Sequence, residues 1–208
     1  MRTRRTRDPE ATKEALLIAA EEVFLEKGFG NTSISDIARR AGITKSLIHH
    51  YFGSKEGIWH AVKERRFTDY SDRQMEMLDV LEPNLDLMKE SFYFYFHFLK
   101  DNPQISRILA WMFLEQDPDD CMEKNKELVA KGLAQLKIMQ EKGIVRKDID
   151  SKFILFVFLA LCQHWFQDRE HFLVDFFTAD EPIPDNLDEL YLESVTRILF
   201  EGVLNRSE

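Results

Sequence analysis

Apolar residues recur every three or four positions through most of the chain, which is the spacing of the buried face of an α-helix. Glycine, proline and short runs of Asp and Asn interrupt this pattern and mark the ends of the predicted elements. No segment alternates as a β-strand does, so the chain is expected to be all-α, with about nine helices. Their expected ranges are residues 9–27, 34–41, 45–52, 55–81, 84–100, 103–116, 119–142, 150–177 and 186–203.

The two short segments between residues 33 and 52 have the spacing of a helix-turn-helix. Ser33 and Asp36 form the pattern of a capping box at the start of one helix, and Gly42 supplies a left-handed residue at its end. Thr44 is placed to cap the next helix. The seam between the two helices is expected to be apolar and to consist of Ile37, Ala38, Ala41, Ile43 and Ile48.

The second of these helices would project a mixed set of side chains away from the seam. They combine hydrogen-bond donors with apolar surface, as a recognition helix in the major groove does. The residues concerned are Lys45, Ser46, Leu47, His49 and His50. The alternative is that two short helices joined by a glycine form only a structural corner.

The formal net charge of −9 is unevenly distributed along the chain. Residues 1–66 hold 13 Lys and Arg against 9 Asp and Glu, a net charge of +4, so the remainder carries −13. A small basic module joined to a larger acidic one commonly binds a polyanion through its basic part. The charge distribution therefore favours nucleic acid as the partner of the N-terminal segment.

Composition excludes several other classes of protein. A hydrophobic content of 44% supports a buried core and excludes a disordered chain. Cys121 and Cys162 are too few and too isolated for a disulfide framework, which favours a reducing cytoplasm. The longest apolar run, residues 153–162, is shorter than the roughly 20 residues that a membrane helix needs. We therefore expect a cytoplasmic protein without a membrane segment or a signal peptide.

Residues 10–62 resemble the DNA-binding domain of the tetracycline-repressor (TetR) family of bacterial transcriptional regulators. The resemblance is carried by the run FLEKGFG, residues 24–30, and by the run TSISDIARRAGITKSLIHHYFGSKEG, residues 32–57. It covers about a quarter of the chain strongly. Beyond it, only the number, lengths and order of the helices are similar.

The resemblance implies roles for individual residues of the motif. Phosphate contacts are implied for Thr32, Ser33, Thr44, His49 and Lys55. Contacts to base edges are implied for Lys45, Ser46, Leu47 and His50, with Tyr51 at or near the DNA backbone. Position 49 departs from the family, which usually has Tyr there, and His49 can imitate that contact only in part. The arginine-rich residues 1–8 lie in an adjacent minor groove, simply neutralise phosphate, or form a solvated, disordered tail.

The rest of the chain is rich in aromatic residues, notably in residues 92–98 and 153–162. Aromatic residues at helical spacing more often form a core than a pocket. The resemblance nevertheless implies a ligand cavity among the middle helices, so we expect an apolar or aromatic small-molecule effector. The expected lining residues are Phe94, Tyr95, His97, Phe98, Trp111, Gln163, His164 and Trp165.

The last predicted helix carries a repeated apolar pattern that favours a homodimer. Two helices from each subunit would form a four-helix interface, and a twofold pair of recognition helices reads two half-sites. The alternative is that these residues only close the core of the single chain. The residues expected in the interface are Leu187, Leu190, Tyr191, Ser194, Val195, Ile198 and Leu199.

The sequence carries no recognisable catalytic or metal-binding motif. It lacks Gly-x-Ser-x-Gly, a phosphate-binding glycine-rich loop and His-Glu-x-x-His, and its histidines form at most pairs with acidic residues. We therefore expect no enzyme, no metal and no cofactor. The rival interpretation is an all-helical carrier or enzyme for an apolar ligand, with a merely structural corner at its N-terminus.

The expected organisation has three parts: a basic disordered arm at residues 1–8, a helix-turn-helix DNA-binding domain at residues 9–54, and a ligand-binding and dimerisation domain at residues 55–208. The helix that begins at Lys55 would connect the two domains. The expected function is a ligand-responsive repressor that an effector releases from double-stranded operator DNA with an inverted repeat. The sequence leaves open whether the protein represses or activates, and whether the effector is an inducer or a corepressor.

Overall fold

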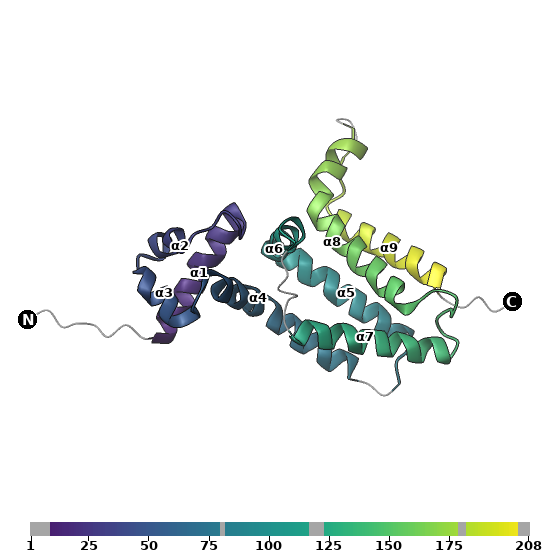
Figure 1. The fold of residues 1–208 in the computed structure, drawn as a ribbon. Coiled ribbons are helices and arrows are strands. Elements are labelled where there is room, and N and C mark those ends of the chain that lie inside the picture. Colours follow the sequence, from purple (N-terminus) through teal and green to yellow (C-terminus); the bar gives the residue numbers. More distant parts are fainter. Residues whose placement is uncertain (1–8, 80–81, 117–122, 179–181, 204–208) are drawn as a thin grey trace, which may run out of the picture. The chain divides into compact units, whose positions relative to one another are not determined.

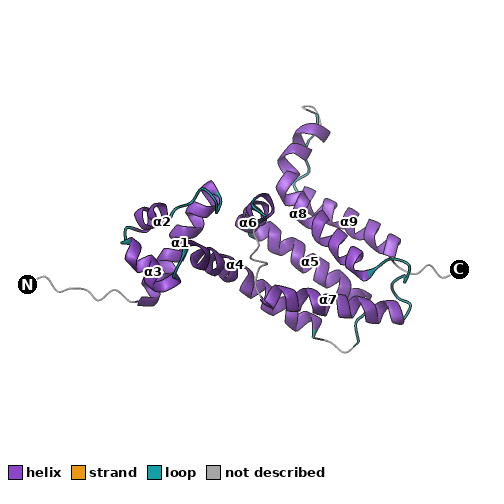
Figure 2. Cartoon of the chain, viewed as in Figure 1, coloured by secondary structure: helices purple, strands orange, loops and turns teal. Residues whose placement is uncertain are grey.

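The computed structural model describes residues 9–79, 82–116, 123–178 and 182–203. This part of the chain contains nine α-helices and no β-strand (Figures 1 and 2), which confirms the all-α prediction. The helices are α1 (Pro9–Lys27), α2 (Ile34–Ala41), α3 (Lys45–Phe52), α4 (Lys55–Leu78), α5 (Leu85–Asp101), α6 (Pro103–Leu114), α7 (Glu123–Glu141), α8 (Ser151–Phe176) and α9 (Leu187–Val203). The arm expected at residues 1–8 lies outside the described residues.

The helix ends follow the local sequence signals with few exceptions. Gly42 ends α2 in the left-handed conformation, with φ of 65°, as expected. Asp150 caps α8, where its side chain accepts a hydrogen bond from the Lys152 N–H at 2.9 Å. α6 ends at Leu114, before the expected residue 116, because Gln116 has a φ of 48°, which a right-handed helix does not allow. The start expected for the next helix at residue 119 lies outside the described residues.

The chain divides into two compact units, and the division differs from the boundary expected after residue 54. The first unit runs to Thr68 and also takes in the chain from Arg107, whereas the second holds Asp69–Ser106 and the chain from Glu123. The difference arises because the first part of α4 and the C-terminal part of α6 add apolar side chains to the core around the helix-turn-helix. Each of these two helices therefore contributes residues to both units.

The core of the first unit fixes α2 and α3 against α1. Leu16, Ala20 and Phe24 follow one another at four-residue intervals on α1 and are almost completely buried. They pack in one cluster with Ile37 of α2 and Ile48 of α3. The other helices complete this cluster with Ile58, Trp59, Val62 and Ile108. Burial of each such side chain contributes about 1.5–3 kcal/mol, so this core holds the helix-turn-helix in one geometry.

Ion pairs also join α1 to the first part of α4. Glu21 is buried, and its carboxylate lies 3.0 Å from Arg65 Nη1 and 2.5 Å from Arg66 Nη2. Arg65 also pairs with Glu14, at 2.6 Å. A buried carboxylate needs such partners because its transfer from water is costly.

The second unit is built around α5, which packs against α8 and α9, while α7 packs against α8. Phe92 of α5 stacks on Phe158 of α8 with ring centroids 3.6 Å apart, and Phe200 of α9 approaches the edge of the same ring. Phe96 and Leu99 are completely buried. Much of the aromatic run 92–98 therefore lies in the core, where aromatic residues at helical spacing are found more often than in a pocket.

Candidate nucleic-acid interface

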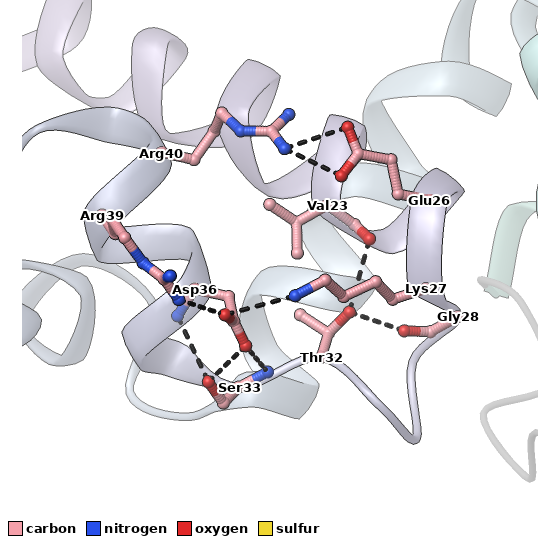
Figure 3. A network of polar contacts seen from close by, with 9 residues as sticks. All are labelled: Val23, Glu26, Lys27, Gly28, Thr32, Ser33, Asp36, Arg39 and Arg40. Carbon is pink, nitrogen blue, oxygen red and sulfur yellow. Dashed lines mark hydrogen bonds and ion pairs between the residues drawn. The ribbon is translucent and has the colours of Figure 1, made fainter.

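The start of α2 is organised by a capping box (Figure 3). Ser33 Oγ accepts a hydrogen bond from the Asp36 N–H at 3.2 Å, and the Ser33 N–H donates to Asp36 Oδ2 at 3.2 Å. This confirms the capping box that the sequence predicts. Ser33 is exposed, and the start of a helix carries the partial positive charge that attracts phosphate.

Asp36 holds together the charged groups around this helix start (Figure 3). Its carboxylate accepts a hydrogen bond from the Ser33 hydroxyl at 2.6 Å, lies 3.3 Å from Lys27 Nζ and pairs with Arg39. The hydrogen bonds from Ser33 and Lys27 lower the pKa of Asp36 from 3.8 to about 2. The Arg39 side chain is 75% exposed, so it adds a basic group beside Ser33. Sequence analysis did not single out Arg39, although its position three residues after the capping Asp36 indicates that the two side chains can form an ion pair.

Arg40, the neighbouring arginine, is bound to α1. Its guanidinium lies 2.9 Å from a carboxylate oxygen of Glu22 and 2.8 Å from one of Glu26. Both carboxylates therefore compensate its charge, whereas the partner of Arg39, Asp36, also pairs with Lys27.

Thr32 does not lie where the resemblance implies. It is 3% exposed, and its hydroxyl donates to the Gly28 carbonyl at 2.6 Å and lies 3.5 Å from the Val23 carbonyl (Figure 3). Its N–H donates to the Phe29 carbonyl at 3.2 Å. The expectation that Thr32 contacts phosphate is therefore corrected, because both of its donors stabilise the turn that follows α1.

α3 turns one side to solvent and the other to the core. Ile48 is completely buried, and Leu47 is half-buried. The exposed residues of this helix are Lys45, Ser46, His49 and His50. At about 100° per residue, Ser46 and His50 lie on the side of the helix opposite Ile48, whereas His49 and Lys45 lie about 100° and about 60° away from it. The structure therefore brings together, on the exposed surface of one helix, most of the side chains that were expected to read DNA.

The hydroxyl of Thr44 does not cap α3 as expected. Thr44 occupies the N-cap position, but among the described residues its side chain makes no capping hydrogen bond. Its Oγ1 lies instead 2.9 Å from Ser46 Oγ. Because Thr44 and Ser46 are both exposed, this pair of hydroxyls lies at the solvent side of the recognition helix.

The His49 ring is hydrogen-bonded to the backbone at the end of α3. Its Nδ1 lies 2.8 Å from the Gly53 carbonyl oxygen, and a carbonyl oxygen can only accept, so Nδ1 carries a proton. In the neutral ring Nε2 is then an acceptor, which cannot donate to a phosphate. The phosphate contact that the resemblance implies for His49 stays an expectation.

Lys55 and Tyr51 are positioned by neighbours within the first unit. Lys55 Nζ donates to the Phe29 carbonyl at 2.9 Å and lies 4.1 Å from the centre of the Phe29 ring. Tyr51 is half-buried against the core, and its ring meets the His50 ring edge-on at 5.3 Å. Lys55 thus links the start of α4 to the turn after α1, in addition to any contact that it makes with DNA.

Part of the expected ligand-binding set lies together in the second unit. Gln163 Nε2 of α8 donates to the Tyr95 hydroxyl of α5 at 2.8 Å. Tyr70 of α4 stacks on Phe94 and Phe98, with ring centroids 5.5 and 4.5 Å apart. We call these five residues the Tyr70 cluster. Burial raises the pKa of both Tyr70 and Tyr95, so their hydroxyls remain protonated. The sequence analysis missed Tyr70, whose only signal was its place on the helix that follows the motif.

The other expected ligand-binding residues do not join this cluster. Trp111 belongs to the first unit, where its ring lies over Gly28. His164 is exposed on α8. Trp165 and His97 contact acidic residues at the start of α9. The residues of the expected set therefore do not form one site. Helical spacing alone does not determine which helices pack against each other, so it could not predict this.

The residues expected in a dimer interface fall on two faces of α9. Leu187, Val195 and Leu199 are buried within the chain, so their assignment to the interface is corrected. The Tyr191 ring stacks on Trp165 with centroids 4.0 Å apart, and it too faces the core of the unit. Leu190, Ser194 and Ile198 are exposed at four-residue intervals. On α8, Phe153, Phe156 and Val157 are exposed as well, and the sequence analysis missed them.

Within the described ranges, no three His, Cys, Asp or Glu side chains gather so that they could hold a metal ion. None of the helices in the described part of the chain combines the length and the hydropathy of a membrane span.

A helix-turn-helix with a solvent-facing recognition helix, followed by a larger helical unit, defines the class of helix-turn-helix transcriptional regulators. Residues 16–62 match the family model of bacterial regulatory proteins, tetR family, and residues 94–195 match that of the tetracyclin repressor-like C-terminal domain. The chain belongs to the TetR family of transcriptional regulators. Regulators of this family bind DNA operators and small-molecule effectors and function as dimers.

Individual relatives and solved structures agree with this assignment. The HTH-type transcriptional repressor NicS of Pseudomonas putida is 26% identical over 86% of this chain and 89% of its own length. The HTH-type transcriptional regulator RutR of Escherichia coli K12 is 27% identical over 98% of this chain and 95% of its own. The crystal structure of a TetR family regulator from Marinobacter aquaeolei superposes with a TM-score of 0.70 at 17% identity, covering 95% of this chain and 97% of that one.

Proposed function

We propose that this DNA-binding regulator is a repressor that binds an inverted-repeat operator as a homodimer and leaves it when an apolar or aromatic small molecule binds. The observation that carries the DNA-reading part is the exposed surface of α3, which holds Lys45, Ser46, His49 and His50, while Ile48 of the same helix is buried in the core. Lys45, Ser46, Leu47 and His50 would read base edges, while Ser33, Thr44 and Arg39 would position the head on phosphates. Such a regulator works in the bacterial cytoplasm, where the chromosome lies, and needs no catalytic group.

The experiment that tests this proposal is selection of bound sequences from a random pool of duplex DNA. The purified protein is used at about 0.15 M salt, where nonspecific attraction to phosphate is already weak. Enrichment of an inverted repeat is the expected result, because a twofold pair of heads reads two half-sites. If no sequence is enriched, with or without a cell extract that supplies a corepressor, the proposal is wrong.

Substitution of Lys45 tests the role of the recognition helix directly. Lys45→Ala is expected to weaken binding to the selected operator by about tenfold, because it removes one charged contact worth roughly 1–3 kcal/mol. Fluorescence anisotropy of a labelled operator measures this loss. Lys137→Ala, at an exposed position of α7, removes the same charge from the other unit and serves as the control. Equal losses of operator affinity in the two variants would show that Lys45 contributes only a nonspecific effect of charge.

The Tyr70 cluster supports an aromatic effector in the second unit. It combines three stacked rings with one partly buried hydrogen bond, the one between Gln163 and the Tyr95 hydroxyl. A planar ligand with one polar group would find stacking surface and a hydrogen-bonding partner there. Phe94 and Phe98 are half-buried, so this group of rings is reachable from the surface of its own unit.

The homodimer would form through the outward faces of α8 and α9. Phe153 and Phe156 on α8 and Ile198 on α9 are each at least 65% exposed, which is unusual for large apolar side chains of a single chain. Pairing of these faces in a second copy would bury them in a four-helix interface.

A further inference from the structure

We infer that the C-terminal part of α6 and Glu115, which directly follows this helix, act as a clamp that positions the turn between α1 and α2 for DNA binding, with Glu115 as the positioning residue. This inference starts from the family's DNA-binding activity and assigns a role to residues outside the helix-turn-helix. The clamp consists of Arg107 and Trp111 of α6 and of Glu115 just after it; it contacts the end of α1, at Leu25, and the turn that follows, residues 28–33. All of these residues belong to the first unit.

The clamp holds the turn by hydrogen bonds to its backbone. The Gly30 N–H donates to both carboxylate oxygens of Glu115, at 2.9 and 3.0 Å, across 85 residues of sequence. Arg107 Nη2 donates to the Leu25 carbonyl at 2.8 Å, and the Trp111 indole N–H reaches the same carbonyl at 3.4 Å. A carboxylate that accepts a backbone N–H makes a strong, charge-assisted bond.

The fit between clamp and turn is too close for any side chain on Gly28. This residue has a φ of 76°, and a Cβ added to it would lie 2.6 Å from Glu115 Oε1 and 2.7 Å from the Trp111 ring. The turn therefore lies directly on the two clamp side chains. A side chain at position 28 would have to push them away.

The clamped turn determines where α2 begins. The Thr32 hydroxyl donates to the Gly28 carbonyl, and Ser33, which follows it, is the N-cap of α2. From α4, Lys55 Nζ holds the Phe29 carbonyl of the same turn. The exposed helix start at Ser33 thus follows a turn that is held by hydrogen bonds at two consecutive residues: at Phe29 by Lys55 of α4, and at Gly30 by Glu115. α6, which carries Arg107 and Trp111, also contributes Pro103–Ser106 to the second unit.

The sign of the change in DNA affinity distinguishes a positioning role of Glu115 from a general effect of its charge. A carboxylate in a DNA-binding unit repels phosphate, so loss of its charge alone should strengthen binding to DNA. Loss of the clamp should weaken binding, because the helix start at Ser33 is no longer held in place for its phosphate. The two explanations therefore predict changes of opposite sign.

The test compares Glu115→Ala with Glu64→Ala, which removes the same charge from an exposed position of α4 in the same unit. The dissociation constant for the selected operator is measured over a series of salt concentrations. Glu64→Ala is expected to bind as tightly as the wild type or more tightly. Glu115→Ala is expected to bind at least about fivefold more weakly, with the slope of log K against log[salt] reduced by about 0.9, the value for one lost phosphate contact. If Glu115→Ala matches Glu64→Ala in both quantities, the inference is wrong.

A second variant keeps the test decisive if Glu115→Ala fails to fold. Glu115→Gln preserves the volume and one acceptor oxygen but loses the charge. Amide hydrogen exchange at Gly30 is expected to be faster in this variant, while exchange in the core of α1 stays unchanged. Unchanged exchange at Gly30 together with unchanged operator affinity would overturn the inference. The exchange measurement needs no DNA, so it also separates this inference from the proposed operator binding, which fails if the wild type selects no sequence.

Discussion

The start of α2 depends on a single carboxylate. Asp36 closes the capping box with Ser33 and gathers Lys27 and Arg39 beside it. Because these partners favour the ionised form, they lower its pKa to about 2. The same residue therefore links the stability of the first unit to the arrangement of basic groups around the helix start.

Acid should weaken the first unit through Asp36. Because the folded pKa of about 2 lies below the ordinary value of 3.8, the stabilisation is present above about pH 4 and is lost as the pH falls through about 2. The melting temperature of the wild type should therefore fall more steeply over this range than that of Asp36→Asn. Thermal unfolding followed by circular dichroism measures both. Glu64→Gln should follow the wild type, and parallel curves for the wild type and Asp36→Asn would contradict the prediction.

At the scale of elements, helices of this chain have two functional faces. α3 buries Ile48 and exposes Lys45 and His49. α9 buries Leu192 and Val195 while it exposes Ile198, and its inner face packs on α5 and α8. The inner faces hold each unit together, and the outer faces are those to which we assign partners in the proposal: DNA for α3, and a second copy of the chain for α8 and α9.

Charge on the outer face of α8 or α9 should abolish the dimer. Phe156→Asp and Ile198→Asp would each place an unpaired carboxylate in the proposed interface, at a cost of several kcal/mol, so the dimer dissociation constant should rise at least about a hundredfold. Size-exclusion chromatography with light scattering measures the mass. Lys137→Asp, at an exposed position of α7, should leave the dimer intact. Dimers of unchanged stability in both α8 and α9 variants would place the interface elsewhere.

At the scale of the whole molecule, two units divide the tasks of a regulator. The first contains the recognition helix and the clamped turn, and the second contains the Tyr70 cluster and the outer faces of α8 and α9. An effector can change operator affinity only by the difference in its own affinity for the DNA-bound and released states. Residues that contact the effector should therefore alter release without altering operator binding in its absence.

Loss of the hydrogen bond between Gln163 and Tyr95 in the Tyr70 cluster should impair release. Tyr95→Phe and Gln163→Leu are each expected to raise, by about tenfold, the concentration of an aromatic ligand that releases half of the operator, because one hydrogen bond is lost. A panel of aromatic acids, phenols and carboxamides is titrated against labelled operator to measure this midpoint. Tyr93→Phe, at an exposed position of the same helix, is the matched control. Equal midpoints for Tyr93→Phe and Tyr95→Phe would exclude the cluster as the ligand site.

The sequence by itself determined the elements and the motif. Helical periodicity, the capping box at Ser33 and the left-handed Gly42 depend on residues within a few positions of one another, so they can be recognised without a fold. For the same reason the outward face of α3 could be predicted, since the buried Ile48 determines which side of so short a helix is exposed. The resemblance to the TetR family rests on this same local stretch.

Only the tertiary structure decided which side chains remain available to partners. Thr32 carries a hydroxyl suited to phosphate, but the neighbouring carbonyls of the turn use it. Val195 and Ile198 belong to one apolar pattern, yet the packing of α9 buries the first and exposes the second. Glu115 meets Gly30 across 85 residues. Such contacts depend on which helix packs against which, and periodicity within a single helix carries no information about its neighbours.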